Sequence, residues 1–575
     1  MTSSAIVRSL TDVCGTRHVI TGDRATERFR QGFRSGDGEA TAVVQPGSLV
    51  ELWRVLEICV AEDAILIMQA ANTGLTEGST PKGSYDRPVI IISTLRLDQI
   101  HVIKNGHQII SHPGATLYKL EKLLAPFDRQ PHSVIGSSCI GASIMGGVCN
   151  NSGGSLVQRG PAFTELSVHA QLTSDGRLRL VNHLGIDLGE TPEEILSALD
   201  RGNIPDAAIR DDFGRASDDS YPNRVRDIDA ESPARFNADT RTLHEASGCA
   251  GKLAVFAVRL DTFPTQTGDK VYYVGTNDES KLTALRRSML ADLPELPISG
   301  EYLHRDCFDI ARKYGKDTLL MIHWFGTDRL PLFFTVKGKM DSWLNKMPLV
   351  PKNLVDRAMQ LLARMLPEAL PKRMLEFREQ FEHHLILKVS GKTAPAVETM
   401  LSDVIGDEGW YLCDEADAKK AMLHRFAAAG AAVRYEAVHP RSVETILALD
   451  IALRRNDREW VEQLPPEIED KLIGKLYYGH FFCHVFHQDY IVKKGVDAVA
   501  LKKEMLAILD HRGAEYPAEH NVGHLYEAKP ALREFYESLD PTNSFNPGIG
   551  KTSKERNYGR TTGQNESVPI ADAAE

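Results

Sequence analysis

The sequence lacks closely spaced cysteines, long apolar runs and an apolar leader. Its eight cysteines are scattered and form no Cys-x-x-Cys pair, a usage typical of reduced thiols in a cytoplasmic protein. No run of about 18 uncharged apolar residues occurs, so the sequence predicts no membrane-spanning helix. Residues 1–30 lack the apolar core of a secretory signal. Together these absences predict a cytoplasmic protein.

An excess of positive charge is also missing. The formal net charge is −11 at pH 7, which argues against general nucleic-acid binding but is compatible with a local basic patch. The composition, 42% hydrophobic and 25% charged, is that of an ordinary soluble protein. A chain of 575 residues is long enough for two or three domains.

Both common nucleotide-binding fingerprints are absent, although one loop is suited to an anion. Residues 72–80 read NTGLTEGST and follow an apolar run at 64–68. The backbone N–H groups and hydroxyls of such a loop suit a phosphate, but the spacing matches neither the dinucleotide fingerprint nor the P-loop. Near the C-terminus, residues 550–552 (GKT) lack the glycine that a P-loop needs five residues earlier, because Phe545 stands there. A nucleoside triphosphatase is therefore not expected.

A second glycine-rich stretch, residues 135–160, reads IGSSCIGASIMGGVCNNSGGSLVQRG. Flexible linkers rarely carry interleaved Ile, Met, Val and Leu, so we interpret it as ordered backbone pressed against a large flat ligand. Residues 41–70 predict a strand, a helix and a strand, with a capping box at Ser48 and Glu51. The first 260 or so residues indicate one α+β domain, and a second domain begins within 262–310.

Six histidine and glutamate residues gather in a short C-terminal part of the sequence. Imidazoles and carboxylates suit a divalent metal or general acid–base catalysis. A single histidine in such a run is usually a satisfied core residue, but six among apolar neighbours favour a site. Two of them are seven residues apart, which is no helix-face spacing, so they need a bend to meet. The set is His480, His484, His487, Glu519, His520 and His524.

Two arginines, Arg425 and Arg434, lie in a segment of small residues that predicts a helix leading into a strand. An arginine in such surroundings can bind the carboxylate of an acid with two parallel hydrogen bonds. A structural salt bridge is equally compatible with the sequence, and both interpretations stay open.

Residues 331–380 are basic in a chain that is acidic overall, with nine lysines and arginines against five acidic residues. One interpretation is a solvated surface. The other is a membrane-interfacial patch, with cations toward anionic lipid and apolar side chains entering the interface. The basic residues are Lys337, Lys339, Lys346, Lys352, Arg357, Arg364, Lys372, Arg373 and Arg378.

These stretches together resemble a known family. The segments QPGS, QAANTGLTEGS, HPGATLYKLEKLL and IGSSCIGASIMGGVCNNSGGSLVQRG resemble the FAD-binding domain of the p-cresol methylhydroxylase/vanillyl-alcohol oxidase flavoproteins. The resemblance continues through GHFFCHVFHQDYIVKKG, YPAEHNVGHLY and DPTNSFNPGIGKTSK. Across nearly the whole chain, the sequence is similar to the bacterial family of quinone-dependent D-lactate dehydrogenases, respiratory enzymes peripheral to the inner membrane.

The resemblance implies that the first glycine-rich loop cradles the FAD pyrophosphate and that the second lines the flavin. Because neither stretch contains a histidine, FAD is expected to be bound noncovalently. The implied FAD-binding residues are Ala70, Ala71, Asn72, Thr73, Gly74, Gly78, Ser79, Gly136, Ser143, Gly153 and, through its backbone, Val255.

The resemblance also implies roles in the C-terminal half. GHFFCHVFH and EHNVG resemble the GHxGDGNxH and EHGxG motifs of related D-2-hydroxyacid dehydrogenases. The chain departs from these motifs at residues 482–485 and at Asn521. These departures affect the implied metal site more than the implied catalytic base. The implied divalent-metal ligands are His480, His487 and Glu519, the implied base is His520, and the implied substrate-carboxylate ligands are Arg425 and Arg434.

The implied fold is α+β: a two-subdomain FAD-binding domain of the p-cresol methylhydroxylase type, an α+β cap and a small basic membrane-binding insert. The implied boundaries are 1–261 and 513–564 for the FAD-binding domain, 262–303, 381–418 and 443–512 for the cap, 304–380 and 419–442 for the insert, and 565–575 for a disordered tail.

The implied activity is oxidation of D-lactate to pyruvate through FAD, with electrons passed to membrane quinone. The implied location is the cytoplasmic face of the bacterial inner membrane, where the protein lies peripherally on anionic phospholipid. Three alternatives are a dehydrogenase of another D-2-hydroxy acid with a different acceptor, a metal-dependent hydrolase and a lipid-surface adaptor. No nucleic-acid partner is expected.

Overall fold

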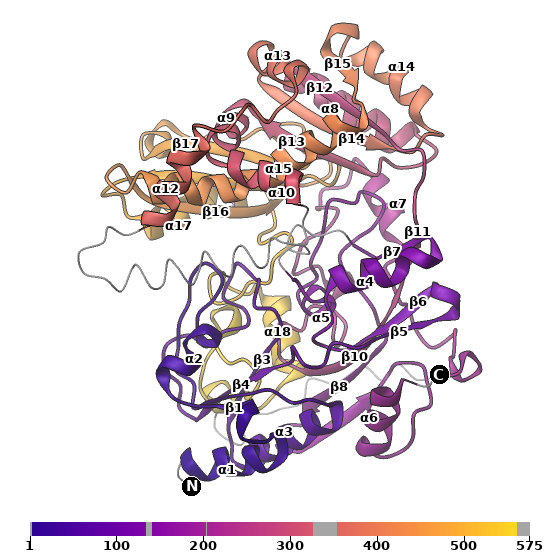
Figure 1. Ribbon diagram of the computed structural model, residues 1–575, viewed down its shortest axis with the longest axis vertical. Coiled ribbons are helices and arrows are strands. Elements are labelled where there is room, and N and C mark those ends of the chain that lie inside the picture. The colour runs from indigo at the N-terminus through magenta and orange to yellow at the C-terminus, as the bar shows by residue number, and fades with distance from the viewer. Residues whose placement is uncertain (1–2, 134–140, 203, 326–352, 561–575) are drawn as a thin grey trace.

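The computed structural model describes residues 3–133, 141–202, 204–325 and 353–560. Its strands form sheets of four, five and seven strands and a two-stranded ribbon, with the two smaller sheets in the lower half of Figure 1 and the largest in the upper half. Some positions of interest lie outside the described residues, namely Gly136, Lys337, Lys339, Lys346, Lys352 and the predicted tail at 565–575.

The N-terminal part of the chain builds the four-stranded sheet, in the order β1-β2-β4-β3. Both β2 and β3 run parallel to β4, because α3 crosses back between them. Ser48 caps α3 as predicted, its Oγ accepting from the Glu51 N–H at 3.0 Å. The Glu51 carboxylate accepts from the Gly47 N–H instead, so only half of the capping box is confirmed. The elements are α1 Ser3–Cys14, β1 Val19–Ile20, α2 Asp23–Arg30, β2 Ala42–Val44, α3 Leu49–Ala61, β3 Ile65–Gln69 and β4 Val89–Ser93.

The five-stranded sheet is antiparallel, in the order β5-β6-β10-β8-β9. Strands β5 and β6 form a hairpin, as the Asn105-Gly106 pair between two apolar runs predicts, and it turns at Asn105 in the left-handed region (φ 53°). Helices α4 and α5 share an apolar cluster with this sheet. The elements are β5 Ile100–Ile103, β6 Gln108–Ser111, α4 Leu117–Leu124, α5 Ile144–Cys149, β8 Ser167–Leu172, β9 Leu178–Asn182, α6 Pro192–Arg201, α7 Tyr221–Arg226 and β10 Ala254–Asp261, with the ribbon of β7 Arg129–Gln130 and β11 Phe263–Pro264.

The seven-stranded sheet is antiparallel, in the order β15-β12-β14-β13-β17-β18-β16. Helices α8, α14 and α17 share one apolar cluster with it, and α9, α13 and α15 share another, so both faces are covered (Figure 1). The elements are β12 Lys270–Thr276, α8 Glu279–Asp292, β13 Ser299–His304, α9 Arg305–Tyr314, α13 Lys372–Gln380, β14 His383–Val389, α14 Ala394–Val404, β15 Trp410–Leu412, α15 Glu415–Val438, β16 Val443–Ala452, β17 Leu472–His480, β18 Val485–Lys493 and α17 Ala498–His511.

Both arginines lie on α15, and the predicted change from helix to strand within residues 420–435 is wrong, because the helix continues to Val438 and the strand β16 begins only at Val443. Alanines at 427, 428, 431 and 432 line its buried side. Such small side chains let α9 approach closely, since a Cβ on Gly315 would lie 2.9 Å from the Ala427 Cβ. Helices α10 Lys316–Phe325 and α12 Leu354–Ala363 also pack against α15. One helix therefore joins the seven-stranded sheet to the helices around it.

The C-terminal part of the chain returns to the first sheet. Leu66 on β3 accepts from the Asn546 N–H at 2.9 Å and donates its own N–H to Ser544 at 2.9 Å. Helix α18 Pro530–Leu539 lies beside this return. Residues 513–530 thereby run between the seven-stranded sheet and the two smaller sheets, which is where the candidate site lies.

Candidate active site

A hairpin brings two of the predicted histidines together. The run from 475 to 492 is two strands, β17 and β18, joined by a short 3-10 turn that ends at His484 in the left-handed region (φ 53°). In this register Tyr478 pairs with His487 and His480 with Val485. The Nε2 atoms of His480 and His487 consequently lie 3.5 Å apart. The bend that the seven-residue spacing required is thus present.

Glu519 completes a cluster with these histidines. Its Oε2 lies 3.3 Å from His480 Nε2 and 3.9 Å from His487 Nε2. The three ligand atoms all lie within 4.8 Å of one another. Adjacent ligands of a divalent ion with bonds of about 2.1 Å are separated by roughly 3.0–3.4 Å. The chemistry and spacing of this donor set therefore fit a divalent metal.

The far side of each imidazole is held by a further carboxylate. His480 Nδ1 lies 2.7 Å from Glu301 Oε1, and His487 Nδ1 lies 3.1 Å from Asp450 Oδ1. Metal-binding histidines usually have such partners, which fix the ring and leave Nε2 for the ion. Burial disfavours the imidazolium, but Glu301 and Glu519 outweigh it and raise the pKa of His480 to about 10. The cluster is therefore set up to attract a proton or a cation.

His520 forms a dyad with the same aspartate. Asp450 Oδ2 lies 2.7 Å from His520 Nδ1 and accepts from the backbone N–H groups of Glu519 and His520 at 2.7 and 3.2 Å. Burial opposes the charged ring, yet Asp450 raises the pKa of His520 above its ordinary value. With Nδ1–H donated to the carboxylate, Nε2 is the free acceptor. The His520 side chain is 31% exposed, so this nitrogen is placed to meet a small substrate.

The remaining two histidines of the predicted set are structural. His484 Nδ1 lies 3.0 Å from the Arg454 carbonyl. His524 has the Gly548 carbonyl at Nδ1 and the Thr80 carbonyl at Nε2. Both rings are buried among backbone acceptors, so these two histidines are satisfied core residues and not part of the site.

The two predicted arginines have different partners along α15. Arg425 Nε lies 3.0 Å from Glu301 Oε2, so the arginine joins the cluster through the carboxylate that also holds His480. Arg434 lies nine positions on, and its guanidinium is bound by Asp317 at 3.0 Å and Asp356 at 2.8 Å. The structure therefore brings Arg425 to the candidate site and places Arg434 in a structural ion pair.

Both glycine-rich stretches meet the segment that carries Glu519 and His520. A Cβ on Gly78 would lie 2.8 Å from Asn521 Nδ2, and a Cβ on Gly153 would lie 2.4 Å from Glu519 Oε1. A side chain at Gly78 would thus displace the Asn521 side chain, and one at Gly153 would displace the Glu519 carboxylate. By contrast, a Cβ on Gly74 would meet nothing within 4 Å, so backbone is open to a ligand there. The first loop therefore has open backbone that a cofactor could approach, and the second loop borders the cluster directly.

The other predicted FAD-binding residues lie along the same two stretches. In the first, the Ser79 hydroxyl donates to Asn72 Oδ1 at 2.9 Å, and Asn72 adopts a left-handed backbone (φ 52°). In the second, Ser143 caps α5 by accepting from the Gly146 N–H at 2.9 Å. Val255 lies on β10 where its pairing register with β8 shifts, and its side chain packs in the cluster that contains α5. Ala70, Ala71 and Thr73 lie between β3 and the rest of the first loop.

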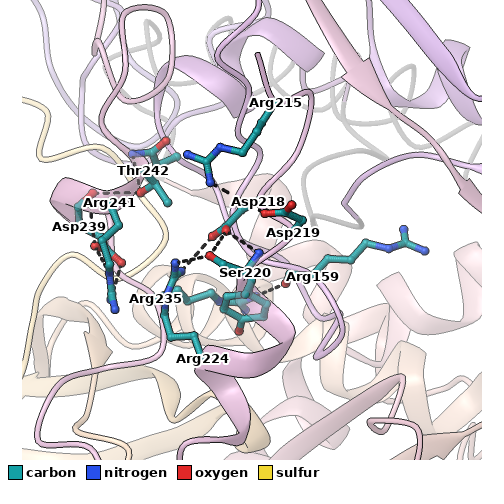
Figure 2. Close-up of polar contacts among 12 residues, drawn as sticks. Arg159, Arg215, Asp218, Asp219, Ser220, Arg224, Arg235, Asp239, Arg241 and Thr242 are labelled. Atoms are coloured by element: carbon teal, nitrogen blue, oxygen red, sulfur yellow. Dashed lines mark hydrogen bonds and ion pairs between the residues drawn. The ribbon is translucent and has the colours of Figure 1, made fainter. Parts of the chain in front are cut away.

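Sequence reasoning missed Arg235, which lies in the polar, irregular segment 198–246. Its Nη2 donates to Glu519 Oε1 at 2.5 Å and to the Gly154 carbonyl at 2.5 Å, while Nη1 donates to the carbonyls of Leu156 and Arg159 at 3.4 Å each. Figure 2 shows it among the charged side chains of this segment. By occupying Oε1, it leaves Oε2 of Glu519 to face the two histidines. No local motif indicates such a role.

Two family models match the chain. One, described as "D-lactate dehydrogenase, membrane binding", covers residues 271–558, and one described as an FAD binding domain covers residues 40–179. The chain is 59% identical over 559 residues to the quinone-dependent D-lactate dehydrogenase of Escherichia coli (strain K12), covering 97% of this chain and 98% of the relative. It is 56% identical to that of Haemophilus influenzae over 560 residues, covering 97% and 99%. The chain belongs to the quinone-dependent D-lactate dehydrogenase family.

Solved structures place this D-lactate dehydrogenase family member in a wider fold group. It matches p-cresol methylhydroxylase with substrate bound at a TM-score of 0.58 and 11% identity, over 96% of this chain and 97% of that one. It matches 4-ethylphenol oxidase from Gulosibacter chungangensis at a TM-score of 0.56 and 11% identity, over 95% and 96%. The predicted α+β fold with an FAD-binding domain of this type is confirmed. None of the described helices combines the length and the apolar character that a bilayer crossing needs.

Proposed function

We propose that this chain oxidises D-lactate to pyruvate with noncovalently bound FAD and delivers the electrons to a membrane quinone. The observation that carries the proposal is the convergence of both glycine-rich stretches on the segment of Glu519 and His520, beside the buried histidine pair. A flavin site alone would serve many reactions, and a histidine cluster alone would suit hydrolysis. Their junction is what a hydroxy-acid oxidation requires, because proton and hydride leave neighbouring atoms.

FAD is the redox group in this proposal: when bound, it accepts two electrons with the Cα hydrogen and passes the electrons onward. The first loop suits its pyrophosphate, because the backbone at Gly74 is open, and the second is proposed to line its flavin ring on the strength of the resemblance. The proposed holding residues within the described chain are Ala70, Ala71, Asn72, Thr73, Gly74, Gly78, Ser79, Ser143, Gly153 and Val255.

The chain's own residues handle the proton and orient the acid. His520 Nε2 takes the proton of the substrate hydroxyl, and Asp450 stabilises the imidazolium that forms. Arg425 is a proposed ligand of the substrate carboxylate, through the guanidinium nitrogens that Glu301 does not hold. His480, His487 and Glu519 are the proposed ligands of a divalent ion, which would lower the pKa of the bound hydroxyl.

The proposed domain boundaries are those implied by the resemblance, with 1–261 and 513–564 forming the FAD-binding domain. Their support is the division of the sheets: strands β1 to β6 and β8 to β10 lie before residue 262, and the seven-stranded sheet spans residues 270–493. The pairing of residues 544–546 with Leu66 supports a discontinuous domain.

The membrane surface of the proposal is the outer side of α12. Leu361 and Leu362 on this helix and Met365 just after its end are 62%, 61% and 82% exposed, an apolar group on the surface of a charged region. Beside them is a depression of about 360 Å³ with four basic and two acidic residues in its lining, namely Arg312, Lys313, Lys316, Arg364, Asp309 and Glu368, and Arg312 is paired with Glu368 at 2.8 Å. Apolar side chains next to cations suit the headgroup region of anionic phospholipid. The proposed location is peripheral, on the cytoplasmic face of the bacterial inner membrane.

The visible spectrum of the purified protein tests the proposal directly. We expect a flavin spectrum that bleaches anaerobically with D-lactate and stays unchanged with L-lactate, and that recovers when a soluble quinone is added. A protein that remains oxidised with D-lactate would overturn the substrate assignment. A protein that cannot be loaded with FAD would overturn the cofactor assignment.

A further inference from the structure

Two cysteines lie next to each other close to the candidate active site, and the proposed proton and hydride transfer does not use them. Cys149 ends α5 on the second glycine-rich stretch, and Cys249 lies in the irregular segment before β10. Both are free thiols. A pair of thiols differs from a single buried cysteine, because its two sulfurs can be joined by oxidation. The pair is therefore a candidate site of covalent modification.

The backbone holds the two cysteines side by side. The Gly248 N–H donates to the Val148 carbonyl at 3.0 Å, and the Ala250 N–H donates to the Cys149 carbonyl at 2.8 Å. Cys249 therefore lies between two backbone hydrogen bonds to the end of α5. Both side chains pack in the apolar cluster that α5 shares with the five-stranded sheet. Within this cluster the Cys149 thiol donates a hydrogen bond to Cys249 Sγ.

The two thiols differ in acidity. Hydrogen bonds from the Cys149 thiol and from the N–H groups of Gly251 and Leu253 lower the pKa of Cys249 despite its burial. The bond to Cys249, together with burial, raises the pKa of Cys149. One thiol thus loses its proton readily and its neighbour keeps it. A nucleophilic cysteine beside a resolving cysteine is the usual arrangement of a redox-active pair.

The burial of the pair determines which oxidants can react with it. Cys149 is half-buried, and Cys249 is fully buried. Thiol–disulfide exchange requires a second sulfur compound to approach one of the two sulfurs directly. Hydrogen peroxide is much smaller, and the half-buried side of Cys149 gives it a way to the pair. The surroundings therefore favour a peroxide over a disulfide as the oxidant.

The end of α5 is bonded to the segment that carries the proposed base. Asn150, the neighbour of Cys149, accepts from Asn521 Nδ2 at 2.7 Å through its side chain and from Asn237 Nδ2 at 2.7 Å through its carbonyl. Asn521 follows His520 directly. The sulfurs of a disulfide are about 2.05 Å apart, closer than two hydrogen-bonded thiols. Joining the pair therefore has to move Cys149, and Asn150 moves with it.

We propose that Cys149 and Cys249 form an oxidation site for hydrogen peroxide, and that the resulting disulfide slows the reaction at His520. The Cys249 thiolate attacks one peroxide oxygen and becomes a sulfenic acid, while the other oxygen leaves as water. The Cys149 sulfur then attacks the sulfenic sulfur, and the hydroxyl leaves as a second water. The two thiols lose two electrons and two protons, and one peroxide becomes two waters. The effect on turnover rests on the proposed function, whereas the oxidation site does not.

The test uses the FAD-loaded, full-length protein, treated with hydrogen peroxide and then with catalase. Remaining thiols are blocked with N-ethylmaleimide during denaturation. Trypsin then releases residues 130–159, which contain Cys139 and Cys149, and residues 242–252, which contain Cys249. Mass spectrometry identifies linked peptides, and fragmentation shows which cysteines are joined. The second readout is dye-linked turnover with D-lactate before oxidation, after oxidation and after treatment with dithiothreitol.

We expect a link between Cys149 and Cys249 and a fall in turnover of about 10-fold or more, since a displacement of about 1 Å can cost a reaction about 100-fold. Dithiothreitol should remove the link and restore the rate. In Cys149→Ser and Cys249→Ser, the link and the reversible fall should both be absent, judged against each variant's own untreated rate. Cys413→Ser changes another half-buried cysteine and is the matched control, which should respond like the unmodified protein.

Three results would overturn the inference. They are the absence of a link between Cys149 and Cys249, a link that runs through Cys139 instead, and a correct link that leaves turnover unchanged. If the unmodified protein is not reduced by D-lactate, the proposed function fails. The peptide map still decides in that case whether the two cysteines are an oxidation site.

Discussion

Helix α15 carries two buried arginines nine residues apart, and the comparison between them shows what decides the role of such a side chain. Arg425 and Arg434 are 9% and 7% exposed and lie in the same alanine-rich helix. Arg425 is bound to Glu301, which also holds His480. Arg434 is bound to Asp317 on α10 and Asp356 on α12. The role of each arginine is therefore set by the carboxylates that it pairs with: Glu301 places Arg425 at the candidate site, and Asp317 and Asp356 place Arg434 near the exposed apolar surface.

The largest effect should come from removing the proposed base at the Arg425 end. We expect His520→Ala to lower dye-linked turnover with D-lactate by about 10²–10⁴-fold, the usual contribution of a positioned general base. FAD content should stay at the unmodified level, because Asp450 still accepts from the Glu519 N–H. The matched control is His511→Ala, an exposed histidine at the end of α17. Full turnover in His520→Ala would assign the proton transfer to another group.

A smaller loss should follow at Arg425 itself. In Arg425→Met, Glu301 keeps His480 but loses its other cation, so the orientation of the histidine ring is less fixed. Changing the partner of a metal-binding histidine typically costs 10–100-fold in affinity or activity, and we expect about that loss in kcat/KM. Metal content after dialysis against trace divalent metal is the second readout, and it should fall together with kcat/KM. If stability fell while both stayed constant, Arg425 would be a structural arginine of the same kind as Arg434.

Sequence information sufficed where the structure depends on neighbours along the chain. The cap at Ser48, the hairpin turn at Asn105 and the helix that became α15 are local, and each was predictable from a few adjacent residues. The first glycine-rich stretch predicted a bound phosphate and the second a large flat ligand for the same reason, because close backbone approach is encoded by the glycines themselves.

The residues that hold the site's side chains in place, by contrast, were not predictable from the sequence. Glu301 is 179 residues from His480, Arg235 is 284 residues from Glu519, and Asp450 is 70 residues from His520. No periodicity or motif links residues so far apart. The turn between β17 and β18 was also hidden, because its left-handed residue is His484 and not a glycine. The fold was therefore more accessible from the sequence than the contacts that set the chemistry.

The exposed apolar surface near Arg434 can be tested separately from the candidate site. We expect replacement of Leu361, Leu362 and Met365 by Ser to weaken binding to liposomes that contain anionic phospholipid by about 10-fold or more, because each side chain loses apolar contact with the interface. Dye-linked turnover should be unchanged. Val499→Ser, at a 70% exposed position on α17, is the control. Equal liposome binding by the triple variant would remove α12 from the proposed membrane surface.

The smallest effect on turnover is expected from replacing Arg434, in contrast to the loss expected for Arg425. Arg434→Met leaves Asp317 and Asp356 without the guanidinium that joins α10 to α12, so stability should fall while the hydrogen bonds of His520 and His480 stay intact. Breaking a buried pair costs about 3–5 kcal/mol, and we expect less because Asp356 is partly accessible, with a Tm lower by about 2–6 °C. Dye-linked kcat/KM should stay within about twofold of the unmodified protein. A loss as large as that of Arg425→Met, with the KM raised, would return Arg434 to the substrate and show that the two ends of α15 act as one site.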